Sequence, residues 1–152
     1  MRIIFVCQGN IIRSPLAENM FRHLAQERGV GEKYQLDSAG TSAYHVGELP
    51  DHRMRQVAQE KGFQYTGKAR QYRRDEFDQH DLIIVMDRSN LRILRSWAST
   101  KEEKKIRMKA LGALEGKCYP EVREKLDLLA FDKDLVKKSH DEQEGDENIQ
   151  TF

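Results

Sequence analysis

The sequence has few of the features that define several large protein classes. Only two cysteines, Cys7 and Cys118, occur among its 152 residues, so it is no disulfide scaffold and suits a reducing compartment. No apolar run approaches the ~18 residues that a membrane span requires. The first residues lack the apolar stretch and cleavage site of a secretory signal. We therefore expect a cytoplasmic protein that neither spans a membrane nor binds one.

An excess of charge of one sign is also missing. The chain carries 26 basic and 25 acidic side chains, which leaves a net charge of +1 and gives no electrostatic reason to expect a nucleic-acid partner. Its five histidines and two cysteines show no metal-ligand spacing. No Gly-x-Gly-x-x-Gly string indicates a dinucleotide site. We therefore expect neither a metal nor another cofactor.

Apolar periodicity predicts strands and helices that alternate along the chain. Short apolar runs predict strands over residues 2–7, 34–39 and 81–86, and a weaker one over 105–111. Helical spacing predicts helices over about 14–28, 51–61, 87–98 and 120–137, the first capped by Ser14 and ended by Gly29. Such alternation is typical of an α/β fold, a parallel sheet with helices on both faces.

The length fits one domain of ordinary size, and the composition changes near its end. Residues 139–152 contain five acids, no Lys or Arg and few apolar side chains, which is typical of a disordered segment. We expect one folded domain over residues 1–138, followed by a disordered acidic tail over 139–152.

One segment, residues 7–15 (Cys-Gln-Gly-Asn-Ile-Ile-Arg-Ser-Pro), combines groups that suit phosphate chemistry. A loop that enters a helix N-terminus points backbone N–H groups inward, and the helix dipole adds to this anion site. Arg13 contributes a planar fork of donors that can bind two phosphate oxygens. The same positive field favours the thiolate of Cys7. A lone cysteine at a strand end is usually a small core residue, but the complete string favours a nucleophile.

This string resembles the signature Cys-x-Gly-Asn-x-x-Arg-Ser-Pro of the low-molecular-weight protein tyrosine phosphatases. Further matches follow in order at residues 37–42, 46–47, 50–51, 69–71, 81–83, 86–87 and 90–91. The resemblance implies a four-stranded parallel sheet with helices on both faces and a phosphate loop after the first strand. It also implies hydrolysis of phosphomonoesters, above all of phosphotyrosine in proteins, through a phosphocysteine.

The resemblance also assigns roles to single residues. Cys7 would be the nucleophile, Arg13 would bind phosphate and stabilise its transfer, and Ser14 would hydrogen-bond the Cys7 sulfur. Tyr44 would line the substrate cleft, and Asn10 would hold the loop in shape through a polar network that includes Ser38. The backbone that cradles the phosphate oxygens would come from Gln8, Gly9, Asn10, Ile11 and Ile12.

Three positions depart from the family pattern. Ile12 replaces a second loop cysteine that often forms a reversible disulfide with the nucleophile, so we expect no such switch. Gly67 replaces a histidine that commonly joins the polar network, so we expect a looser or water-filled network. No Asp-Pro pair supplies the general acid. Glu121, which follows the Tyr-Pro pair of this region, is the candidate acid, with Glu124 and Asp127 as alternatives.

These departures leave two other functions open. Without its general acid, the loop could serve a protein that mainly binds phosphotyrosine or another oxyanion. An arsenate reductase could share the same loop, but that chemistry relies on additional downstream cysteines, and only Cys118 is present. Hydrolysis of phosphotyrosine is therefore the function that the sequence favours.

Overall fold

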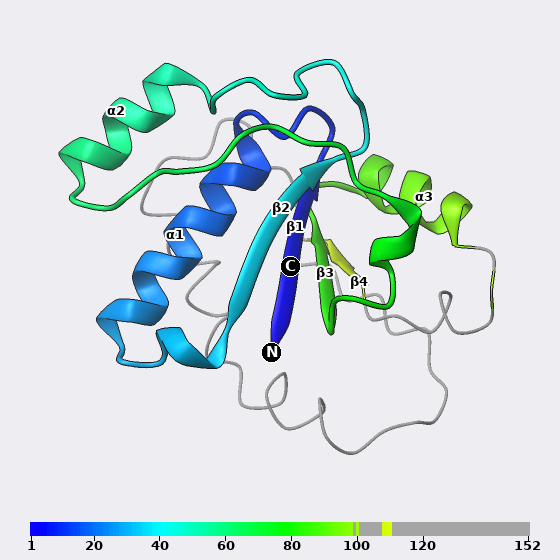
Figure 1. Cartoon of the computed structure of the whole chain (residues 1–152), viewed down its shortest axis with the longest axis horizontal. Helices are drawn as coiled ribbons and strands as arrows, with labels where there is room; N and C mark the ends of the chain where they lie inside the picture. Colours follow the sequence, from blue (N-terminus) through cyan, green and yellow to red (C-terminus); the bar gives the residue numbers. More distant parts are fainter. Residues whose placement is uncertain (99, 101–107, 111–152) are drawn as a thin grey trace.

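The structure is a computed structural model, and it describes residues 1–98, 100 and 108–110. In this part of the chain, four parallel strands form one sheet in the order β2-β1-β3-β4 (Figure 1). The strands are β1 (Arg2–Cys7), β2 (Gln35–Gly40), β3 (Leu82–Val85) and β4 (Met108–Ala110). The helices are α1 (Arg13–Glu27), α2 (His52–Glu60) and α3 (Arg88–Trp97), with single 3-10 turns at η1 (Gly31–Lys33) and η2 (Arg74–Glu76). The expected α/β fold is confirmed.

The first strand lies inside the sheet and pairs on both sides. It pairs with β2 so that Cys7 lies opposite Gly40, and with β3 so that Val6 lies opposite Val85. Ile3 to Cys7 are all buried, as expected for a strand covered on both faces. Because the strands are parallel, the loops that follow β1, β2 and β3 leave from the same edge of the sheet.

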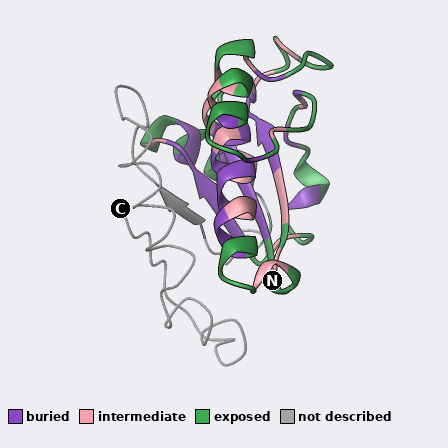
Figure 2. Ribbon diagram, turned by 90° about the vertical axis from the view of Figure 1, so that its left-hand side faces the viewer, coloured by how far each residue is buried: buried purple, intermediate pink, exposed green. Residues whose placement is uncertain are grey.

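Alternate side chains of β1 enter two separate cores, one on each face of the sheet. Ile3, Phe5 and Cys7 face α1, and the Phe5 ring lies 5.8 Å from that of Phe21. In Figure 2, α1 lies in front of the strands, and buried residues alternate along it with intermediate and exposed ones. Ile4 and Val6 face the opposite core, which contains Tyr72, Phe77, Leu91, Leu94 and Ala98. Full burial of such a side chain stabilises the fold by about 1.5–3 kcal/mol.

The helix after the phosphate loop begins differently from the prediction. Helix α1 starts at Arg13, and the preceding Ile12 makes no side-chain capping bond. Ser14 is therefore not the cap, because its hydroxyl lies inside the loop and bonds Asn10 and Cys7 instead. The predicted end is confirmed: the helix stops at Glu27, and Gly29 adopts a φ of 69°, which favours glycine.

The remaining boundaries agree with the predictions to within three residues. Strand β2 spans Gln35–Gly40 rather than 34–39, and β4 covers only Met108–Ala110 of the predicted 105–111. The predicted helix over 120–137, the domain boundary at 138, the acidic tail over 139–152, Cys118, Glu121, Glu124 and Asp127 lie outside the described residues. Within the described ranges, no helix is both long and apolar enough to cross a membrane.

Candidate active site

The Cys7 sulfur lies at the base of the loop that joins β1 to α1. Cys7 is the last residue of β1 and is only 3% exposed. The backbone N–H of Asn10 donates to its Sγ at 3.2 Å, and the Ser14 hydroxyl lies 3.0 Å from the same atom. The expected contact between Ser14 and Cys7 is present.

Asn10 holds the loop in its curled shape. It is the only non-glycine residue with positive φ (54°) in the described chain, a conformation that asparagine tolerates better than most residues. Its side-chain NH₂ donates to Ser14 Oγ at 2.8 Å and to Ser38 Oγ at 3.0 Å. Its Oδ1 accepts from the backbone N–H of Arg70 at 3.0 Å. The expected network with Ser38 is therefore present, and Arg70 extends it.

The loop backbone retains donors for an anion. Within the described part of the chain, the backbone N–H groups of Gly9, Ile11 and Ile12 donate no hydrogen bond. These groups lie just before the N-terminus of α1, whose dipole also favours negative charge. The loop carbonyls are held from outside instead, because Ser42 donates to the Gln8 oxygen at 2.9 Å and Asp51 to the Ile11 oxygen at 2.9 Å.

Gly40 allows the loop to lie against β2. A Cβ atom at Gly40 would lie 2.6 Å from the Gln8 oxygen and 3.1 Å from the Asn10 nitrogen. No side chain fits this space without moving the loop backbone. The close contact between the loop and β2 therefore requires glycine at position 40.

Arg13 is oriented by a carboxylate from the neighbouring strand end. Its Nη1 donates to Asp87 Oδ2 at 2.7 Å, with side-chain exposures of 16% and 27%. Burial raises the pKa of Asp87, but hydrogen bonds from Ser89 and Arg13 outweigh it and leave that pKa below its ordinary value. A charged partner thus holds the guanidinium at the first turn of α1.

Two ring side chains contact the loop from outside it. The Tyr65 hydroxyl donates to the Ile12 carbonyl at 3.1 Å, and burial, with smaller contributions from the charges of Cys7 and Asp51, raises the pKa of Tyr65. The His45 ring lies over Gly9, where a Cβ atom would be 3.1 Å from His45 Cδ2. The adjacent Tyr44 is 83% exposed. Its aromatic ring is therefore available on the loop that runs beside the phosphate loop.

A polar pocket of about 130 Å³ opens next to Asn10 and Ser38. It is lined by Asn10, Pro15, Glu18, Asp37, Ser38, Pro50, Thr66, Gly67 and Lys68. A Cβ atom at Gly67 would meet nothing within 4 Å, so the missing side chain leaves space in this place. Burial raises the pKa of Glu18 in the pocket, although hydrogen bonds with Arg22 and Ser38 oppose the shift.

Sequence reasoning missed three residues that the structure places around the loop: Tyr65, Arg70 and Asp87. A signal existed for Asp87, because it follows β3 and the carboxyl ends of adjacent parallel strands meet at one edge. Arg70 lies in the segment 69–71 that matches the family pattern, but that match assigned it no role, and Tyr65 carried no signal at all. They come from the irregular segment between α2 and η2, whose path the sequence pattern does not specify.

Comparisons with known proteins agree with this geometry. Residues 2–117 match the profile of the family described as "Low molecular weight phosphotyrosine protein phosphatase". A putative low molecular weight protein-tyrosine-phosphatase from Synechocystis is 47% identical over 92 residues, or 60% of this chain and 59% of that protein. The Gallus gallus low molecular weight phosphotyrosine protein phosphatase is 40% identical over 113 residues, or 74% of this chain and 72% of that protein.

Solved structures show the same fold. YfkJ from Bacillus subtilis superposes with a TM-score of 0.68 at 33% identity, covering 86% of this chain and 87% of that one. A protein tyrosine phosphatase from Entamoeba histolytica gives a TM-score of 0.73 at 30% identity, with coverage of 91% and 96%.

Proposed function

The chain belongs to the low molecular weight phosphotyrosine protein phosphatase family, and we propose that its loop of residues 7–13 hydrolyses phosphotyrosine in proteins through a phosphocysteine intermediate. The proposal rests on the hydrogen bonds around the Cys7 sulfur. Cys7 Sγ receives the Asn10 N–H and lies 3.0 Å from the Ser14 hydroxyl, at the N-terminus of the helix that begins with Arg13.

In the first step, the Cys7 thiolate attacks phosphorus in line with the leaving phenolate oxygen. The S–P bond forms while the P–O bond to the phenol breaks, and the leaving oxygen takes a proton. Negative charge on the equatorial oxygens is stabilised by Arg13 and by backbone N–H groups that were in place before the substrate arrived. The backbone donors we assign are those of Gln8, Gly9, Ile11 and Ile12, because the expected fifth donor, the Asn10 N–H, donates to the Cys7 sulfur instead.

In the second step, water attacks the phosphocysteine. The P–O bond to water forms, the S–P bond breaks, and the products are phosphate and the Cys7 thiolate. Ser14 stabilises the thiolate as it leaves, because its Oγ accepts from Asn10 and its hydroxyl proton can turn from the Ala39 carbonyl, 3.3 Å away, to the sulfur at 3.0 Å. We propose Glu121 as the acid that protonates the phenolate and Tyr44 as the residue that stacks on the substrate ring. Glu121 lies outside both the described residues and the matched segment.

The two other functions that the sequence left open receive less support. The Synechocystis and Gallus gallus relatives and the Entamoeba histolytica structure are phosphatases by name, which favours an enzyme over a phosphotyrosine-binding protein and over an arsenate reductase. A cytoplasmic location and the absence of nucleic-acid and membrane partners remain predictions.

Replacement of Cys7 and Arg13 tests the proposal. We expect Cys7→Ser to abolish hydrolysis of a phosphotyrosine peptide while phosphate binding stays measurable by calorimetry, because a hydroxyl is a far weaker nucleophile in the same cradle. Arg13→Lys should impair both binding and rate, since a point charge replaces a two-pronged contact. Arg95→Lys, on the exposed face of α3, is the matched control. Turnover by Cys7→Ser, or parental kinetics in Arg13→Lys, would reject the proposed roles.

A further inference from the structure

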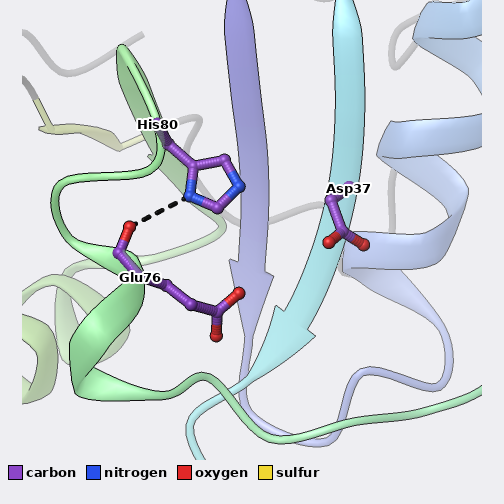
Figure 3. A group of neighbouring side chains, drawn as sticks. All are labelled: Asp37, Glu76 and His80. Carbon is purple, nitrogen blue, oxygen red and sulfur yellow. Dashed lines mark hydrogen bonds between the residues drawn. The ribbon is translucent and has the colours of Figure 1, made fainter.

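Three side chains outside the loop gather on one face of β2. The potential ligand atoms of Asp37, Glu76 and His80 all lie within 4.8 Å of one another. Figure 3 shows Asp37 on β2, with Glu76 and His80 on the segment that precedes β3. His80 Nδ1 lies 3.1 Å from the Glu76 carbonyl, and as a donor it would support the end of η2.

The two carboxylates already hold a cation that belongs to the chain. Glu76 accepts from Arg70 through both oxygens, at 2.7 and 2.9 Å, and Asp37 Oδ2 accepts from Arg70 Nη2 at 2.7 Å. Glu76 also accepts from the Arg73 N–H, and Asp37 Oδ1 from the Ser38 N–H. With all four oxygens accepting hydrogen bonds, the cluster is a binding site for the Arg70 guanidinium.

The Glu76 carboxylate is the buried part of this cluster. Its side chain is 3% exposed, against 30% for Arg70 and 50% for Asp37. Burial alone would raise the pKa of Glu76, but hydrogen bonds from Arg70 and Arg73 outweigh it and lower that pKa. A two-pronged arginine contact fixes both the position and the rotation of the guanidinium. The Arg70 side chain is therefore tied to η2 and to β2 at once.

The main chain of Arg70 contacts the phosphate loop directly. Its N–H donates to Asn10 Oδ1 at 3.0 Å, and its carbonyl accepts from the Gly40 N–H at 2.8 Å. The main chain of this segment pairs with β2 at an isolated bridge between Gly40 and Gln71 rather than along a full strand ladder. The peptide that carries the Arg70 N–H is also held at its other end, where the Ala69 carbonyl accepts from the Gly47 N–H at 2.8 Å. The Arg70 side chain adds the contacts of this segment to Glu76 and Asp37.

The direction of the Asn10 amide depends on this peptide. An asparagine side chain has one accepting end and one donating end, and the Arg70 N–H requires the oxygen on its side. The NH₂ group then faces Ser14 and Ser38, and Ser14 in turn faces the Cys7 sulfur. A continuous path of hydrogen bonds thus connects Arg70 to the nucleophile.

We propose that Arg70, clamped by Glu76 and Asp37, is a positioning residue that sets the shape of the phosphate loop through its main-chain hydrogen bond to Asn10. The inference rests on the proposed function, because the shape of the loop matters only if the loop holds phosphate. It assigns an indirect catalytic effect to two carboxylates that touch neither substrate nor Cys7.

Glu76→Gln tests the proposal, because it keeps the side-chain shape and removes the charge. We expect kcat to fall and the dissociation constant of inorganic phosphate, measured by calorimetry, to rise, each by about 2- to 30-fold. The pH midpoint of Cys7 alkylation by iodoacetate should move upward as Ser14 loses its orientation. Asp75→Asn is the matched control, because Asp75 lies in the same turn, is 68% exposed and pairs with Arg73 only at 3.5 Å; it should change none of these values.

A lower melting temperature with unchanged phosphate affinity and alkylation midpoint would show a purely structural role and overturn the inference. If Glu76→Gln does not fold, Asp37→Asn removes the charge from one of the three Arg70 contacts and should change the same quantities in the same direction, by less. Phosphate binding and alkylation do not require turnover. A parent without phosphatase activity would therefore overturn the proposed function, while these two measurements would still decide the role of Arg70.

Discussion

The guanidinium of Arg13 and the carboxylate of Asp87 connect the starts of two helices that cover opposite faces of the sheet. Arg13 is the first residue of α1, and Asp87 is the residue before α3. The two side chains meet at 2.7 Å. Asp87 Oδ1 accepts from the Asn90 N–H at 2.8 Å and from the Ser89 hydroxyl at 2.6 Å. The phosphate-binding arginine is therefore positioned by the beginning of α3.

We expect Asp87→Asn to lower kcat/KM for a phosphotyrosine peptide by about 5-fold. A hydrogen bond to a charged group contributes about 1.5–3 kcal/mol, and the partial exposure of this pair reduces that value to roughly 1 kcal/mol. Steady-state kinetics measure the effect. Asp78→Asn, at an exposed position, is the control and should leave kcat/KM at the parental value. Equal kinetics in all three proteins would mean that Asp87 does not orient Arg13.

The same pair predicts a pH dependence of stability. The pKa of Asp87 is lower in the folded protein than its ordinary 3.8. The charged carboxylate therefore stabilises the fold above about pH 4, and this contribution disappears as the pH falls through the lower, folded-state pKa. The difference in melting temperature between the parent and Asp87→Asn should be constant from about pH 7 to pH 4 and should shrink below that. A difference that persists unchanged at about pH 2 would contradict this linkage.

Gly40→Ala should damage the phosphate loop through steric overlap alone. The added Cβ would lie 2.6 Å from the Gln8 carbonyl oxygen, and such overpacking costs about 1–3 kcal/mol. We expect a lower melting temperature together with weaker phosphate binding, measured by calorimetry. Gly29→Ala is the contrast, because Gly29 has a φ of 69° and no atom within 4 Å of its Cβ position. It should lower stability but leave phosphate affinity unchanged; parental phosphate affinity in Gly40→Ala would exclude the overlap.

If Glu121 protonates the leaving group, Glu121→Gln should slow hydrolysis of phosphotyrosine by ~100- to 10,000-fold. A substrate with an acidic phenol as leaving group should be affected little, since it departs without a proton. The two rates can be compared by steady-state kinetics on both substrates. Identical rates for variant and parent on both substrates would remove Glu121 from the mechanism, and the same comparison on Glu124→Gln and Asp127→Asn would then test the alternatives.

The sequence predicted the elements of regular structure because each has its own local signal. The apolar run that ends at Cys7 and the glycine at position 29 fixed β1 and the end of α1 to within a residue. Ser14 shows where local signals fail. A serine at a helix start usually caps it, but here Asn10 and the Cys7 sulfur bind its hydroxyl. The contacts of the Ser14 hydroxyl with Asn10 and Cys7 therefore take the place of the expected capping bond.

The loop string was predictable from sequence, but the contacts that support it were not. Asn10 and Ser38 were expected to meet because the family pattern contains both. The contacts of Arg13 with Asp87, Tyr65 with Ile12, and Arg70 with Asn10 join positions 53 to 74 residues apart. They depend on strand register and on the path of an irregular segment. Neither quantity has a local pattern in the sequence.

The central place of β1 also determines how the nucleophile responds to unfolding. Cys7 ends a strand that is paired on both sides and buried from Ile3 onward, so local fraying cannot release it. The backbone amides of β1 should exchange with deuterium only when the whole domain opens. Core substitutions far from the loop should then reduce activity in proportion to the unfolded fraction, while every molecule that remains folded turns over substrate at the parental rate.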